Sequence, residues 1–93
     1  MTSASASLKK DVIVVNELGL HARSAAKVAK AARQATGRVW LARESECVDA
    51  KQVIDMLALG AAQGDRLRIA VESSDDTEVL NTIVALFEKG FGE

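Results

Sequence analysis

The sequence predicts an α+β fold, an open-faced β-sandwich in which three helices cover one face of a four-stranded antiparallel sheet. Some segments alternate apolar and polar residues or are rich in β-branched residues, which is typical of strands. Others repeat apolar residues at three- and four-residue spacing, which is typical of helices. The two kinds follow one another in the order β-α-β-β-α-β-α. Strands with one apolar face bury it best against amphipathic helices.

The first strand is expected over Leu8–Val15, because its second half, Val12–Val15, is β-branched throughout. The segment 16–20 then turns, and a helix is expected over Ala22–Ala35. One stripe of this helix carries small apolar residues at helical spacing: Ala25, Val28, Ala29 and Ala32.

A second strand is expected over Arg38–Ala42 and a short third strand over Cys47–Val48. The second helix is expected to begin near Asp49, which can form an N-terminal cap pair with Gln52. Its predicted inward face consists of Ala50, Val53, Ile54 and Leu57.

The last strand is expected over Arg66–Glu72, where apolar and charged residues alternate. The last helix is expected over Asp76–Lys89, with Ser73 and Ser74 as candidate caps. Its predicted inward residues are Leu80, Ile83, Val84 and Phe87.

Length and composition indicate one domain over residues 8–93, preceded by a disordered tail at 1–7. A net charge of −1 and only three aromatic residues argue against nucleic acid as a partner. The single Cys47 excludes an intrachain disulfide and fits a reducing compartment. Because the apolar runs are too short for a signal peptide or a membrane span, we expect a cytoplasmic monomer without membrane insertion.

His21 is the only histidine, and it stands where the first turn becomes the first helix. The first amides of a helix have no intrahelical partner and form an anion site. An imidazole is a good nucleophile at neutral pH. A phosphoryl group on His21 could contact the amides of Ala22 and Arg23 and the guanidinium of Arg23. By spacing alone, a lone histidine near a helix start is more often a capping or surface residue than a nucleophile.

Lys27 and Lys30 continue a basic stripe that begins at Arg23. By default such a stripe is a solvated face, and its position beside His21 makes a docking surface for an acidic partner an equal alternative, so Lys27 and Lys30 are candidate docking residues. Cys47 and His21 together are too few ligands for a metal site, and we expect no metal and no cofactor.

The segment Asn16–Arg23 (NELGLHAR) resembles the active-site signature of the HPr family, the histidine-containing phosphocarriers of the bacterial phosphotransferase system. The resemblance extends over nearly all of residues 8–93, including the segments 49–54 and 59–65. It implies that the Nδ1 atom of His21 is phosphorylated by enzyme I, which draws on phosphoenolpyruvate. It also implies transfer of the group to an enzyme IIA-type domain.

Two positions depart from the family pattern. Ser24 stands where proline usually follows the arginine of the motif, which adds an amide donor and a hydroxyl near the phosphate. We therefore include Ser24 among the candidate phosphate-binding residues. Gln52 stands where many members carry a serine that a regulatory kinase phosphorylates, and an amide cannot accept a phosphoryl group.

The sequence thus predicts a phosphoryl relay rather than an enzyme that turns over. One alternative is an HPr-like regulatory protein of the nitrogen-related branch, which acts by phosphorylation-dependent docking instead of sugar uptake. A remote alternative is a small anion-binding domain that is never phosphorylated.

Overall fold

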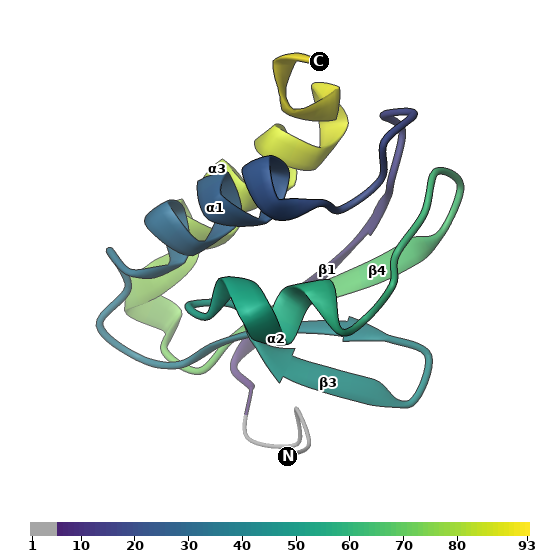
Figure 1. Ribbon diagram of the computed structural model, residues 1–93. Coiled ribbons are helices and arrows are strands. Elements are labelled where there is room, and N and C mark those ends of the chain that lie inside the picture. The colour runs from purple at the N-terminus through teal and green to yellow at the C-terminus, as the bar shows by residue number, and fades with distance from the viewer. Residues whose placement is uncertain (1–5) are drawn as a thin grey trace.

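The computed structural model describes residues 6–93, in which strands and helices follow the predicted order (Figure 1). The strands are β1 (Leu8–Ile13), β2 (Val39–Arg43), β3 (Glu46–Asp49) and β4 (Arg66–Val71). The helices are α1 (Ala22–Ala32), α2 (Val53–Leu57) and α3 (Thr77–Glu88), with short 3₁₀ turns at η1 (Ser74–Asp76) and η2 (Gly90–Gly92). Within this described part of the chain, no helix has the length and apolar content needed to cross a bilayer.

The strands form one antiparallel sheet in the order β1-β4-β2-β3. Leu67 of β4 pairs with Val12 of β1, and Ile69 pairs with Leu41 of β2. All four side chains are buried. Because directly paired residues point to the same side of a sheet, they build one continuous apolar face. The helices cover that face (Figure 1), which confirms the predicted open-faced α+β sandwich.

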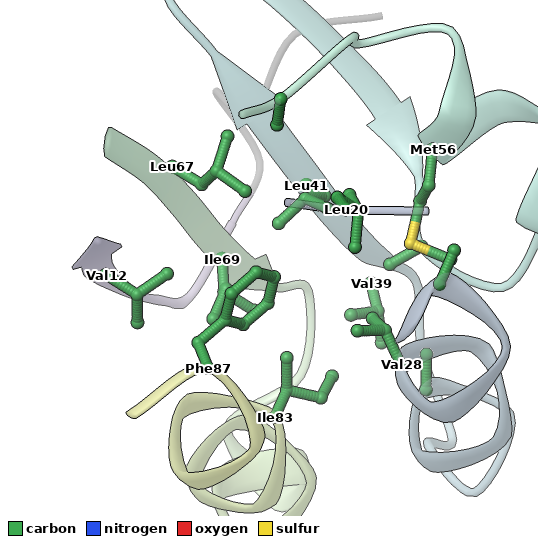
Figure 2. Close-up of a cluster of buried hydrophobic side chains, with 14 of the residues drawn as sticks. Val12, Leu20, Val28, Val39, Leu41, Met56, Leu67, Ile69, Ile83 and Phe87 are labelled. Atoms are coloured by element: carbon green, nitrogen blue, oxygen red, sulfur yellow. The ribbon is translucent and has the colours of Figure 1, made fainter. Parts of the chain in front are cut away.

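The core lies between the helices and the apolar face of the sheet (Figure 2). Phe87 and Ile83 of α3 lie over Ile69, and Val28 of α1 lies beside Val39. Burial of each such side chain stabilises the fold by about 1.5–3 kcal/mol. The inward stripe predicted for the first helix is confirmed, since its four members are all buried: Ala25, Val28, Ala29 and Ala32.

The first strand and the first helix both end earlier than predicted. The ladder of β1 stops at Ile13, two residues before the predicted end at Val15. Val14 leaves the ladder because its amide donates to the Asp65 carbonyl and its own carbonyl accepts from the Gly64 amide. The regular part of α1 ends at Ala32 instead of Ala35, and 3₁₀-type bonds tighten the residues that follow.

The second helix starts later than predicted, immediately after Gln52. The expected cap at Asp49 is wrong: its Oδ1 accepts from the Lys51 amide at 2.8 Å and closes a separate turn. The later start changes which side chains face the core. Ile54 is 77% exposed, contrary to the prediction, and Met56 is buried instead. The other residues predicted to face inward are buried or half-buried: Ala50, Val53 and Leu57.

The last helix, α3, starts at Thr77, one residue after the predicted start, but neither of the serines predicted as caps serves as its cap: its N-cap is Asp76, without a side-chain hydrogen bond. Ser73 Oγ accepts from the Asp75 amide at 3.1 Å and caps η1, whereas the carbonyl of Ser74 accepts from Thr77 Oγ1. The disordered tail predicted at 1–7 falls mostly outside the described residues. Within the described part, the Ser7 amide donates to the Val71 carbonyl at 2.9 Å.

Candidate functional site

The turn between β1 and α1 is held against the segment that precedes β4. Gly19 has a φ of +67°, a left-handed conformation that favours glycine. A Cβ at Gly19 would lie 2.6 Å from the Ala61 carbonyl oxygen. The Leu20 amide donates to that same oxygen at 3.0 Å. This close approach fixes where the turn ends, and His21 is the next residue.

His21 is the N-cap of α1 and has an extended backbone. Its Nδ1 accepts from the Arg23 amide at 3.3 Å, and its own amide donates to Ser24 Oγ at 3.0 Å. A backbone amide can only donate, so Nδ1 directs its lone pair at the first turn of the helix. The side chain is 26% exposed, which leaves the ring accessible from solvent.

The three candidate phosphate-binding residues occupy that first turn. Ala22 is exposed, and the Arg23 side chain is 68% exposed. Ser24 is fully buried, and its hydroxyl lies 3.3 Å from the Gly19 carbonyl oxygen, to which it can donate. The Ser24 hydroxyl is therefore engaged within the turn, while the exposed surface of the site is formed by the first two helical residues.

Glu93 completes the site, although sequence analysis gave it no role. Its Oε2 lies 2.6 Å from His21 Nε2 and 3.6 Å from Arg23 Nε. Its Oε1 accepts from Asn16 Nδ2 at 2.9 Å. Glu93 is 72 residues from His21 in the chain, so no local pattern could have paired them. Asn16 belongs to the recognised motif, but the motif alone does not indicate what its side chain contacts.

The carboxyl group of Glu93 lies in an environment that favours its charge. The side chain is only 16% exposed, and this burial raises its pKa. Hydrogen bonds from Asn16 and His21 and the positive charge of Arg23 outweigh the burial, so that the pKa is lower than that of an ordinary glutamate. An anionic oxygen therefore faces the far side of the His21 ring.

The predicted docking residues lie farther along α1. The Lys27 ammonium donates to the Phe91 carbonyl at 2.6 Å and so contacts the segment after α3. Lys30 is exposed and forms no hydrogen bond or ion pair within residues 6–93. Both lysines line a shallow groove between α1 and α3, whose walls also include Ala31 and Leu86.

Gln52 occupies the N-cap of α2 and is exposed. Its side chain forms no capping hydrogen bond. Gln52, which the family resemblance places at the regulatory-serine position, is therefore accessible and presents an amide without a hydroxyl.

The fold and the site together define a class: a small open-faced α+β protein that presents one histidine, with the lone pair of its Nδ1 directed at the first turn, at the positive end of a helix. The family model described as the PTS HPr component phosphorylation site matches residues 8–89. The chain therefore belongs to the HPr family, the phosphocarrier proteins of the phosphotransferase system.

Individual relatives agree with this assignment over nearly their whole length. The chain is 33% identical to a phosphocarrier protein HPr of Cupriavidus necator, covering 92% of this chain and 97% of the relative. It is 36% identical to one of Treponema pallidum, covering 90% and 96%. A crystal structure of HPr from Thermoanaerobacter tengcongensis superposes with a TM-score of 0.86 at 30% identity, covering 92% of this chain and 97% of that chain.

Proposed function

We propose that His21 is the phosphoryl acceptor, that enzyme I is the donor and that an enzyme IIA-type domain receives the group. One observation carries this proposal: the Nδ1 lone pair points at the Arg23 amide, 3.3 Å away, where α1 begins. An atom in that position can attack as a nucleophile. The phosphoryl group that it receives then lies at a helix N-terminus, which stabilises negative charge.

In the proposed step, Nδ1 of His21 releases the hydrogen bond from the Arg23 amide, and its lone pair forms a bond to phosphorus as the bond to the donor's leaving group breaks. The transferred group keeps its three terminal oxygens, and the proton on Nε2 stays in place. The amides of Ala22 and Arg23 and the exposed Arg23 guanidinium stabilise the charge on those oxygens. Transfer to the acceptor reverses the step and returns the electron pair to Nδ1.

The remaining roles follow from position and from the family. Ser24 supports the first turn of the phosphate site, and Lys27 and Lys30 dock the partner. Gln52 removes the serine-kinase route of regulation. The protein works in the cytoplasm as a single chain without metal or cofactor, and it is consumed and regenerated by other proteins rather than turning over as an enzyme.

The first prediction tests this proposal. Incubation with enzyme I and phosphoenolpyruvate is expected to add one phosphoryl group, detected by intact-mass spectrometry. Phosphohistidine is acid-labile and base-stable, so the added mass should disappear after brief acid treatment and survive base. The variant His21→Ala should gain no mass. An acid-stable label, or a label on the alanine variant, would contradict the proposal.

A further inference from the structure

We propose that three exposed apolar side chains on the segment leading to His21 form a docking patch for the protein that exchanges the phosphoryl group with it. This apolar patch consists of Ile13, Val15 and Leu18. Its occupant is an apolar area of the phosphotransfer partner, enzyme I, beside the partner's own reactive group. The inference rests on the proposed function of His21 as phosphoryl acceptor.

The patch gathers most of the large apolar side chains that the described chain exposes. Within residues 6–93, four such side chains are exposed, and three of them lie between positions 13 and 18. Leu18 is the most exposed of the three, at 64%. The fourth, Ile54, belongs to α2. Single exposed apolar residues are common on protein surfaces, whereas a group of them marks an interaction site.

The backbone explains why two of these side chains point away from the core. Buried and exposed residues alternate over positions 11–16, and Val14 is buried. Because alternate residues of an extended segment point to opposite sides, Ile13 and Val15 share the outward side. The Gln63 side chain donates to the Val15 carbonyl at 3.1 Å and holds this end of the segment in place.

Leu18 lies at the centre of a β-turn. The Gly19 amide donates to the Asn16 carbonyl at 3.1 Å and closes the turn, with Glu17 and Leu18 as its two central residues. Central turn positions favour Gly, Pro, Asn, Asp and Ser, whose backbone or side chain suits the turn. A leucine here contributes neither to the turn nor to the core. Its apolar surface is therefore available to a partner.

The patch is continuous with the phosphoryl-transfer site. One shallow groove is lined by Val15, Leu18 and Glu93, and Glu93 Oε2 lies 2.6 Å from His21 Nε2. A second groove also includes Val15 and extends to Ile13. A standard protein interface buries about 800 Å² on each partner, far more than one imidazole ring. A partner whose reactive atom meets His21 therefore covers Leu18 and reaches Val15.

The charges around the patch differ from those of α1, which has no acidic residue in its first turn. Glu17 and Glu88 are exposed and form no ion pair within residues 6–93. Acidic residues that line the two grooves outnumber the basic one: Asp11, Glu17, Glu88 and Glu93 against Arg66. The matching partner surface is apolar with basic residues around it. Because α1 favours the opposite charge, the two surfaces together fix one orientation of the partner.

The second prediction tests the patch with Leu18→Asn. Asparagine suits a central turn position, so urea denaturation should show wild-type stability. In the enzyme I reaction, KM for this protein should rise about tenfold with kcat unchanged, because one buried leucine contact is lost. The rise should be the same at low and high salt, since the contact is apolar. Leu18→Met keeps the apolar surface and is the matched control, with wild-type KM. Val15→Thr should raise KM by a smaller factor.

The outcomes separate this inference from the proposed function. If wild type is phosphorylated and Leu18→Asn keeps the wild-type KM, the patch is wrong and the proposed function stands. A fall in kcat alone would equally overturn the docking role. If wild type binds enzyme I in calorimetry without being phosphorylated, the proposed function fails, and a tenfold weaker Kd of Leu18→Asn still supports the patch. If wild type neither binds nor is phosphorylated, both fail.

Discussion

At the scale of single residues, the site depends on a histidine that serves as both helix cap and candidate nucleophile. An N-cap residue has its backbone outside the helix and its side chain over the first turn. His21 meets both conditions, and the Ser24 hydroxyl satisfies its amide in return at 3.0 Å. The departure of Ser24 from the family's proline therefore has a structural use, since a proline cannot supply this acceptor.

The third prediction concerns that reciprocal cap. Replacement Ser24→Ala leaves the His21 amide without its acceptor and should lower the free energy of unfolding by about 1 kcal/mol. Urea denaturation followed by circular dichroism measures this directly. Ser45→Ala, in the exposed turn between β2 and β3, is the control and should be close to neutral. Equal stability of the two variants would mean that the hydroxyl contributes nothing to the cap.

At the scale of secondary-structure elements, Asp76 joins the loop after α1 to the start of α3. It is 3% exposed and accepts from the amides of Thr36 and Gly37, both at 2.9 Å. Hydrogen bonds from these two amides lower the pKa of the Asp76 carboxyl. Burial opposes them, and the Thr36 hydroxyl and the charge of Lys51 add to the lowering. The ionised carboxylate thus holds two elements together that are 40 residues apart in the chain.

The fourth prediction follows from the sign of that shift. The stabilisation by Asp76 is complete above its ordinary pKa of 3.8 and is lost as the pH falls through the lower pKa of the folded state. Asp76→Asn, which turns one acceptor into a donor facing an amide, should cost about 1–3 kcal/mol at neutral pH. The difference between wild type and variant should shrink below pH 3.8. Urea titrations across this range measure it, and a difference independent of pH would contradict the assignment.

At the scale of the whole molecule, the distribution of charge matters more than its total. The net charge is −1. Helix α1, which His21 caps, nevertheless carries basic residues and has no acidic residue in its first turn. Lys27 is held by the Phe91 carbonyl, whereas Lys30 has its ammonium free within residues 6–93. We expect a partner that docks at His21 to cover this side of α1 as well, and Lys30 to act mainly on the encounter rate.

The fifth prediction tests this electrostatic steering. Lys30→Glu should slow association with enzyme I and weaken its salt dependence, because exposed charges are screened beyond about 8 Å at physiological ionic strength. The stability of the phosphorylated protein should not change. Lys9→Glu, on β1, alters the net charge equally and is the control. Rates at low protein concentration and several salt levels decide the matter, and equal effects of the two variants would leave α1 without a special docking role.

The identity and order of the elements follow from the sequence, since they depend on local periodicity that each segment carries by itself. The stripe of small residues in α1 and the alternation in β4 are local patterns of this kind. Element ends were less predictable because they depend on contacts from elsewhere. Val14 leaves its strand for Gly64 and Asp65, and Asp49 caps a turn where a helix was expected to start.

The candidate site divides in the same way. His21, Arg23 and the helix amides are adjacent in the chain, and a short motif was enough to group them. Glu93 and the anchoring of Phe91 depend on how α3 packs beside α1, which brings residues 16, 21 and 93 together only in the folded chain. By itself, the sequence determined the fold class and the place of the histidine, because both depend on neighbouring residues. The tertiary structure decided the second contact of the imidazole ring, because its partner comes from the other end of the described chain.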